Sequence, residues 1–142
     1  MPKNEIYSYL KMADCFVMSS ISEGFSIAKL EAMMFEKPLV LTQVGGAEDV
    51  IKNNDIGYLI PPVYDLSNNV DIKITEIKAE IDKGIYKKNN IDDFIFAIED
   101  IIKNNEKWKD KAKLANLKVK NDYNVQAVMS KYLQLFDTML QK

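Results

Sequence analysis

Residues 15–31 read CFVMSSISEGFSIAKLE, and this stretch decides the fold. The apolar run Cys15–Ser20 predicts a buried strand, Gly24 marks a turn, and the apolar spacing beyond it predicts a helix. Two carboxylates, Glu23 and Glu31, flank the start of that helix, where free N–H groups and a partial positive charge suit a phosphate. If the segment is helical throughout, the two acids lie about 12 Å apart along the axis. That separation is about the reach needed to hold both ends of a nucleotide-sugar across its diphosphate.

The residues that follow repeat the alternation of helix and strand. Residues 26–36 have apolar side chains at helical spacing, and Pro38 stops that helix. Leu39–Thr42 predicts a second strand, Ala47–Asn53 a short helix and Gly57–Ile60 a third strand. Strands and helices that alternate with short links imply a parallel sheet with right-handed crossovers. The expected fold class is therefore α/β, with a Rossmann-like parallel sheet of about three strands flanked by helices.

The second half of the chain predicts helices. Residues 63–90 are polar and less regular, so we expect an insertion there, in which Ile72–Ile85 could form a helix. Residues 91–104 and Val125–Leu140 have apolar side chains at helical spacing, and another helix lies between them. The residues expected to face inward are Phe94, Ile95, Ile98, Ile101 and Ile102, then Trp108, Ala112, Ala115 and Val119, and finally Val128, Met129, Tyr132, Leu133, Phe136 and Leu140.

The composition argues against several classes of protein. The chain has 142 residues and a net charge of −2, without the basic patch that nucleic-acid binding needs. It contains no His and no Arg, so the commonest acid–base group and the bidentate phosphate clamp are both absent. With one cysteine, Cys15, we expect no disulfide framework, no metal site and no cofactor. No apolar run approaches membrane-spanning length, so we expect a cytoplasmic protein.

Six short motifs carry a resemblance to a known family. They occur in order along residues 3–62 and are Ala13–Ser20, Glu23-Gly24-Phe25, Leu30–Met33, Lys37–Thr42, Val44–Ile51 and Gly57–Pro62. In this order and spacing, the chain resembles the family-four retaining glycosyltransferases of the GT-B fold. Residues 91–140 resemble that family more weakly, in spacing and helical pattern.

The resemblance implies that residues 1–142 are one partial domain, the second half of the C-terminal, donor-binding domain. Three upstream strands, the acceptor domain and the basic residues that neutralise the diphosphate would then be missing. We therefore expect a fragment, a truncated reading frame or one piece of a split enzyme, without activity alone. Its partner would be the N-terminal acceptor domain or a subunit that carries it. The full-length enzyme would bring the chain to the inner face of the membrane.

The resemblance also implies roles for individual residues. Glu23 matches the family's first Glu, which contacts the donor sugar near the reacting carbon, although a helix-start acid fits the same position. Glu31 matches the second Glu, which accepts hydrogen bonds from ribose hydroxyls, although an exposed helix Glu would look alike. Backbone N–H groups that would bind sugar hydroxyls and the distal phosphate come from Gly24, Phe25, Ser26 and Ile27. Enzymes of this kind generally need no metal in the active site.

Four neighbouring features have structural interpretations. We expect Lys29 to lie in solvent rather than on a phosphate, and Gly45-Gly46 to shape the turn after the second strand. Glu36 stands where the family often has Gly, which leaves the end of the first crossover helix open. The side chains expected in the core are Met33, Met34 and Trp108.

Three functions follow from these features. The first is the donor-binding portion of a retaining glycosyltransferase, which moves a sugar from a UDP- or GDP-sugar to a polysaccharide, lipopolysaccharide or glycolipid. The second is a non-catalytic module that docks onto a partner subunit carrying the rest of the enzyme. The third, a dinucleotide oxidoreductase, is weak because no G-x-G-x-x-G follows a strand.

The first strand also predicts an interaction. In a Rossmann topology it would pair with a strand that this chain lacks, so Cys15–Ser20 should have an unpaired edge. That edge has no Lys or Pro to prevent association. We expect the same strand of a second copy to cover it, in an antiparallel dimer about a two-fold axis. Cover by residues 63–90 of the same chain is the alternative.

Overall fold

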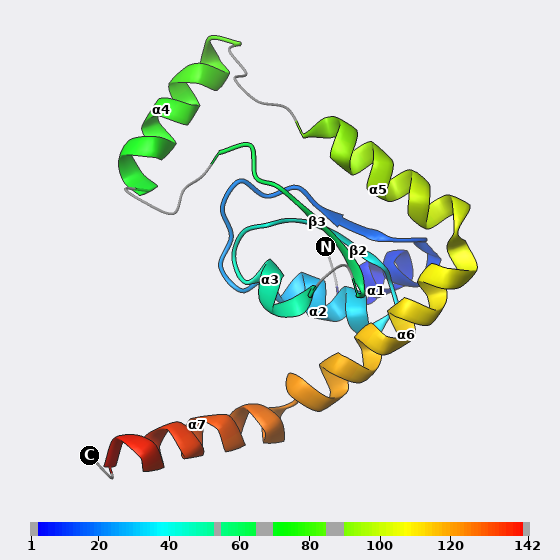
Figure 1. Cartoon of the computed structure of the whole chain (residues 1–142), viewed down its shortest axis with the longest axis vertical. Helices are drawn as coiled ribbons and strands as arrows, with labels where there is room; N and C mark the ends of the chain where they lie inside the picture. Colours follow the sequence, from blue (N-terminus) through cyan, green and yellow to red (C-terminus); the bar gives the residue numbers. More distant parts are fainter. Residues whose placement is uncertain (1–2, 53–54, 65–69, 85–89, 141–142) are drawn as a thin grey trace.

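Short runs of branched and aromatic residues form a parallel sheet. The computed structural model describes residues 3–52, 55–64, 70–84 and 90–140. Its strands are β1 (Phe16–Met18), β2 (Leu39–Thr42) and β3 (Gly57–Ile60). They run parallel in the order β1-β2-β3, with Val17 opposite Val40 and Val40 opposite Tyr58. The α/β fold class is therefore confirmed, with an open sheet flanked by helices (Figure 1).

Seven helices occur in the described residues. They are α1 (Lys3–Met12), α2 (Ile27–Met34), α3 (Ala47–Val50), α4 (Val70–Asp82), α5 (Ile91–Lys103), α6 (Asn105–Asp122) and α7 (Val125–Leu140). Helix α3 is shorter than the expected Ala47–Asn53, and Asn53 lies outside the described residues. Helix α4 falls within the expected insertion, whose residues 65–69 and 85–89, including Ile85, are likewise outside them.

The central strand β2 divides the core into two layers. All four of its residues are buried, and successive side chains point to opposite faces. Leu39 and Leu41 pack in one cluster with residues of α1, α2, α3 and the second half of α6. Val40 packs in the other cluster with Ile60, residues of α5 and Trp108 at the start of α6. Figure 1 shows how α6 passes beside the sheet and so contributes to both layers.

Helix α6 also fastens the ends of the two crossover helices. The Asn116 side chain donates a hydrogen bond of 2.7 Å to the carbonyl oxygen of Met34, at the end of α2. Lys118 Nζ donates one of 2.5 Å to the carbonyl of Val50, at the end of α3. Donors at these positions satisfy carbonyl groups that a helix end leaves without partners. The polar residues of α6 thus hold α2 and α3 against the sheet.

Helix α2 ends earlier than expected, at Met34 rather than at residue 36. The Lys37 N–H binds the Ala32 carbonyl at 3.0 Å, and the Glu36 N–H binds the Met33 carbonyl at 3.0 Å. This pair of bonds is a Schellman motif, which needs a left-handed residue after the helix. Glu36 takes that conformation, with a φ of 54°, where glycine is normally favoured. Met34, which we expected in the core, is 56% exposed.

A cluster of hydrogen bonds around Asp100 joins β3, α5 and α6. Asp100 accepts hydrogen bonds from the Tyr58 hydroxyl at 2.9 Å and from Trp108 Nε1 at 2.6 Å. It also accepts one of 2.7 Å from the Asn104 side chain. Trp108 is buried as expected, and so are Ala112, Ala115 and Val119. On α5 the expected inward face is narrower than predicted, because Ile95 and Ile102 are exposed.

The expectation for the last helix is wrong. None of the residues of α7 is buried, and the side chains of Met129, Tyr132, Leu133 and Phe136 are each more than half exposed. Asn124 starts the helix by accepting a hydrogen bond of 2.8 Å from the Ala127 N–H. The chain turns there, and α7 leads away from the sheet (Figure 1). Its apolar face therefore has no partner among the described residues.

Two surfaces bear on partners. Strand β1 lies at an edge of the sheet, and no strand of the described residues pairs with its free side. Cover by a second copy stays a prediction.

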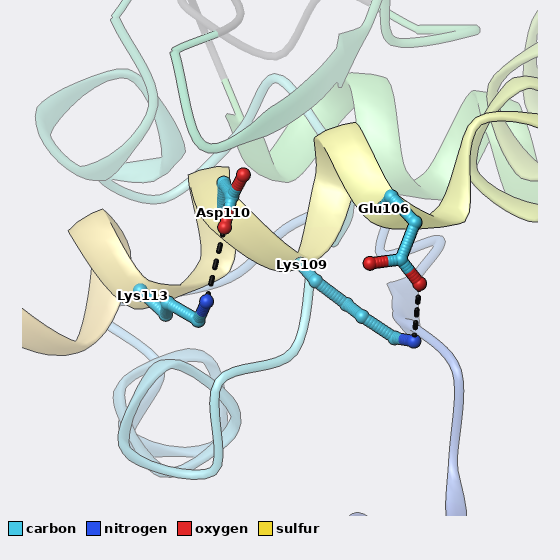
Figure 2. Close-up of polar contacts among 4 residues, drawn as sticks. All are labelled: Glu106, Lys109, Asp110 and Lys113. Atoms are coloured by element: carbon cyan, nitrogen blue, oxygen red, sulfur yellow. Dashed lines mark hydrogen bonds and ion pairs between the residues drawn. The ribbon is translucent and has the colours of Figure 1, made fainter.

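On α6, Figure 2 shows Lys109 paired with Glu106 at 2.8 Å and Lys113 paired with Asp110 at 3.0 Å. All four of these side chains are largely exposed, so this part of α6 is a solvated helix face.

Candidate functional site

The carboxyl ends of the three strands lie at one edge of the sheet. Residues 19–26 follow β1, residues 43–46 follow β2, and Pro61 follows β3. In open α/β sheets ligands bind at this edge, where loops and helix N-termini converge. The expected site residues, from Glu23 to Glu31, all belong to the first loop and to α2. This edge is therefore the candidate site.

The centre of the site is a contact between two backbone segments. We call residues 23–25 the Glu23 loop and Gly45-Gly46 the glycine turn. A Cβ atom at Gly45 would lie 2.2 Å from the Glu23 carbonyl oxygen and 2.4 Å from that of Gly24. Gly45 and Gly46 also have φ angles of 51° and 69°, which side chains disfavour. The glycine turn thus does more than reverse the chain, because it is the surface on which the Glu23 loop rests.

Lys29 corrects a prediction. It is fully buried rather than solvated, with 0% of its surface exposed. Its Nζ donates a hydrogen bond of 2.8 Å to the Gly45 carbonyl and lies 4.2 Å from the centre of the Phe25 ring. Burial lowers the pKa of Lys29, while the charges of Asp49 and Glu23 act in the opposite direction. Helical spacing could have revealed this position, because Lys29 shares a face with the buried Ala32 and Met33.

Tyr123, at the end of α6, is a site neighbour that we did not expect. Its ring stacks on Phe25 with the ring centres 5.6 Å apart. Its hydroxyl donates a hydrogen bond of 3.3 Å to the Asp49 carbonyl. Burial, with the charges of Asp49 and Asp122, raises the pKa of Tyr123. No local signal marks this residue, since it lies almost a hundred positions after Phe25.

The two acids that define the stretch are available for a ligand. Glu23 is exposed in its loop, and Glu31 is half-buried on α2. Neither carboxylate makes a hydrogen bond or an ion pair with a residue that the structure describes. Each therefore has free oxygen atoms that can accept ligand hydroxyl groups.

Between the acids lies the start of α2. Ser26 is its N-cap residue in extended geometry, and its side chain makes no capping hydrogen bond. The first N–H groups of a helix have no partners within it, so here they lack a side-chain acceptor as well. Gly24 and Ile27 are exposed, and Phe25 is half exposed. These positions can therefore offer backbone N–H groups to an anion.

A small pocket lies between the residues that directly follow β1 and helix α5. It has a volume of about 60 Å³ and is lined in part by Ser19, Thr42, Tyr64 and Phe94. The Tyr64 hydroxyl is buried without a hydrogen-bond partner among the described residues. The volume suits about two water molecules rather than a sugar or a base. This pocket is too small to be the ligand site itself.

The described residues offer few groups for metal binding or thiol chemistry. In residues 3–52, 55–64, 70–84 and 90–140, no three His, Cys, Asp or Glu side chains gather closely enough to hold a metal ion. Cys15 is half-buried, and burial with the charge of Asp14 raises the pKa of its thiol. Such a thiol is a poor nucleophile at neutral pH. None of the described helices is long and apolar enough to cross a bilayer.

Comparisons with known proteins give partial sequence matches. The chain is 35% identical to N-acetyl-alpha-D-glucosaminyl L-malate synthase of Bacillus anthracis over 78 residues, which are 55% of this chain and 20% of that protein. It is 32% identical to UDP-Gal:alpha-D-GlcNAc-diphosphoundecaprenol alpha-1,3-galactosyltransferase of Escherichia coli over 79 residues, or 54% and 20% of the two chains. With glycosyltransferase 1 domain-containing protein 1 of Xenopus tropicalis the identity is 37% over 59 residues, or 42% and 17%.

The matched segment spans at most a fifth of the length of these relatives. No solved structure gives a significant match. The family model described as Glycosyl transferases group 1 matches residues 1–76, more than half of the chain. That segment contains the three strands, the Glu23 loop and the glycine turn. The chain therefore belongs to the family of glycosyl transferases group 1.

Proposed function

We propose that this chain is the donor-binding portion of a retaining glycosyltransferase. It would bind a UDP- or GDP-sugar, whose sugar moves to a polysaccharide, lipopolysaccharide or glycolipid acceptor. One observation carries the proposal. The Glu23 loop rests on the glycine turn, and the start of α2 has a free carboxylate on each side, Glu23 before it and Glu31 after it. Family membership supports the reaction class.

Each part of the site has a role in this proposal. The Glu23 carboxylate would lie near the reacting carbon and stabilise the positive charge that develops on the sugar during transfer. The Glu31 carboxylate would accept hydrogen bonds from the ribose hydroxyls. Backbone N–H groups from Gly24 to Ile27 would bind the distal phosphate and sugar hydroxyls, as helix starts do with anions.

The charge of the site explains why we propose that the chain is inactive alone. A diphosphate carries about two negative charges, and such charges need cationic donors in an enzyme site. This chain has no Arg, and the lysine nearest the loop, Lys29, is buried. The missing cations would come from another domain or subunit. That part would also hold the acceptor.

The names of the relatives support the substrate class. The Escherichia coli relative is named for a UDP-Gal donor and a diphosphoundecaprenol-linked acceptor. The Bacillus anthracis relative is named as a glucosaminyl malate synthase. Of these two names, the Escherichia coli one specifies a nucleotide-sugar, and we propose a donor of that class for this chain, with a lipid-linked glycan among the candidate acceptors.

Titration of the labelled protein by NMR tests the proposal, with UDP, UDP-glucose and GDP-mannose as probes. Without the missing cations we expect weak binding, with a Kd on the order of 1 mM. Glu31→Ala should weaken UDP and UDP-glucose alike, because both contain ribose. Glu23→Ala should weaken UDP-glucose and leave UDP unchanged. Glu106→Ala, an exposed acid on α6, is the control. Equal shifts in wild type and the Glu23→Ala/Glu31→Ala protein would refute the assignment.

A second candidate, a non-catalytic assembly module, is favoured by the exposed apolar face of α7 and the free edge of β1. It would dock onto a partner or a second copy and need no nucleotide-sugar. Sedimentation of wild type and Val17→Lys separates the possibilities, since Val17 lies at the middle of β1. A strand-paired dimer should dissociate or precipitate after this change. A monomer at high protein concentration would exclude the dimer.

A further inference from the structure

Lys29 is the one fully buried charged side chain in the described part of the molecule, and the proposed donor contacts do not use it. Its position is unusual, because lysine is almost never fully buried unless its ammonium group is paired. The Lys29 ammonium meets a carbonyl and an aromatic ring instead of a carboxylate. Both partners belong to the segments that form the candidate site.

We propose that Lys29 is a positioning residue, whose buried ammonium group holds the Glu23 loop on the glycine turn before any ligand binds. The effect of this contact on nucleotide-sugar binding rests on the proposed function. The contact itself does not, so the two can be tested separately.

The direction of the side chain supports this role. Side chains on a helix lean toward its N-terminus, and Lys29 is the third residue of α2. Its stem therefore runs back under the loop that precedes the helix. There the Nζ atom reaches the Gly45 carbonyl at 2.8 Å and the Phe25 ring centre at 4.2 Å. One ammonium group thus links the two segments, which are twenty residues apart.

The close fit of the backbones explains why a link is needed. At Gly46 a Cβ atom would lie 2.9 Å from the Phe25 ring and 3.5 Å from Lys29 Nζ. Phe25 is 46% exposed, so apolar burial alone holds it weakly. A cation beside an aromatic ring and a charge-assisted bond to a carbonyl together supply the missing attraction.

The charges around Lys29 set its dependence on pH. Asp49 of α3 and Glu23 of the loop favour the ammonium form, while burial disfavours it and lowers the pKa. Tyr123 stacks on Phe25 from the end of α6 and also titrates at alkaline pH. A neutral amine keeps no cation–π contact. The cation–π contact should therefore be lost at a pH below the ordinary lysine value of 10.5, because burial lowers the pKa of Lys29.

Amide hydrogen exchange measures how firmly the two segments are held together. In Lys29→Met, which keeps the buried stem, protection of the Val44 and Ala47 amides should fall by about tenfold or more relative to wild type, because these amides are hydrogen-bonded on either side of the glycine turn. Lys29→Arg keeps the charge and should restore most of the protection. Lys118→Met is the matched control, because Lys118 also binds a backbone carbonyl but lies away from the loop. It should leave these two amides within about twofold of wild type.

Exchange that is unchanged in folded Lys29→Met would overturn the proposal. If that variant does not fold, a pH titration of protein that keeps Lys29 tests the proposal instead. The Lys29 side-chain signal and the Gly45 amide should then shift with one midpoint, in a Tyr123→Phe background that removes the phenol. Separate midpoints would also overturn it. These outcomes need no ligand, so they stand even if the proposed function fails.

Binding adds the functional arm of the test. If the loop in Lys29→Met is formed only one-tenth of the time, the apparent Kd for UDP-glucose should rise about tenfold. Lys29→Arg should stay near wild type. Lost protection with unchanged UDP-glucose affinity would show that the loop is positioned by Lys29 but is not the donor site. Failure of wild type to bind any probe would refute the proposed function alone.

Discussion

Helices α6 and α7 follow each other in the chain, yet they relate to the core in opposite ways. Helix α6 is rich in Lys, and still it buries Trp108, Ala112, Ala115 and Val119. Helix α7 carries more large apolar residues and buries none. Apolar periodicity therefore identifies a face suited to burial, whereas burial itself requires an opposing surface. The sheet and α2 supply that surface to α6.

The largest effect should come from the buried face of α6. Trp108→Ala should lower the free energy of unfolding by about 3–5 kcal/mol, because it leaves a cavity between α5, α6 and the sheet. Urea unfolding measures the loss. Leu117→Ala, at a side chain 55% exposed on the same helix, is the control and should cost less than about 1 kcal/mol. Similar losses for the two variants would contradict the contrast between the faces.

The polar partner of Trp108 should have the next largest effect. Hydrogen bonds from Trp108 and Tyr58 hold the pKa of Asp100 below its ordinary value of 3.8. Burial and the Asp100 contact raise the pKa of Tyr58 to about 12. Asp100→Asn should cost about 1–3 kcal/mol at neutral pH, since it disrupts hydrogen bonds to a charged acceptor.

The sign of the pH dependence follows from these shifts. The stabilisation by Asp100 is complete above its ordinary value and is lost as pH falls below 3.8. The stabilisation by Tyr58 is complete below pH 10 and is lost as pH rises toward about 12. The difference in unfolding free energy between wild type and Asp100→Asn should therefore shrink at both extremes. A constant difference across this range would exclude the hydrogen-bonded cluster.

The end of α2, which packs on α6, should give a smaller effect of opposite sign. Glu36 has a φ of 54°, a conformation that costs an L residue about 1–2 kcal/mol. Glu36→Gly removes this strain and should stabilise the protein by about 0.5–1 kcal/mol after the added freedom of the unfolded chain. Thermal unfolding measures the gain. Glu36→Ala should give none, because alanine meets the same strain.

The smallest effect should come from α7. Phe136→Ala should change the unfolding free energy by less than about 0.5 kcal/mol, because 55% of this side chain is exposed. Urea unfolding at low protein concentration gives the value for the isolated chain. A loss above about 1.5 kcal/mol under these conditions would mean that the chain itself covers this face, and it would place α7 with α6 rather than apart from it.

The sequence-based expectations for the core are correct for some elements and wrong for others. Helical spacing identified the buried residues of α6, and the strands Leu39–Thr42 and Gly57–Ile60 were placed to the residue. The same spacing misplaced Ile95, Ile102 and the inward face of α7. A periodic pattern reports which side chains share a face, but the width of the buried part depends on what packs there. Helix ends are subtler still, as the left-handed Glu36 shows.

Some features of the candidate site follow from the sequence, and others depend on packing. Glu23, Gly24, Phe25, Ser26, Ile27 and Glu31 are adjacent in the chain, so their clustering at one edge of the sheet follows from a strand–loop–helix pattern. Lys29 was misjudged because lysine is normally a surface residue. Tyr123 was missed because its contact with Phe25 depends on the path of α6. The roles of the six residues stay predictions for the titrations to test.

The order of strands and helices, the parallel sheet and the glycosyltransferase motifs follow from the amino-acid sequence, because these features depend on residues close together in the chain. Four other features are visible only in the folded molecule: Lys29 is buried, Gly45 supports the Glu23 loop, Tyr123 stacks on Phe25, and no residue of α7 is buried by the described residues. The physical reason is that burial and contact depend on surfaces brought together from distant segments. Local propensity limits the secondary structure that each segment can form, whereas packing determines which other segments it contacts.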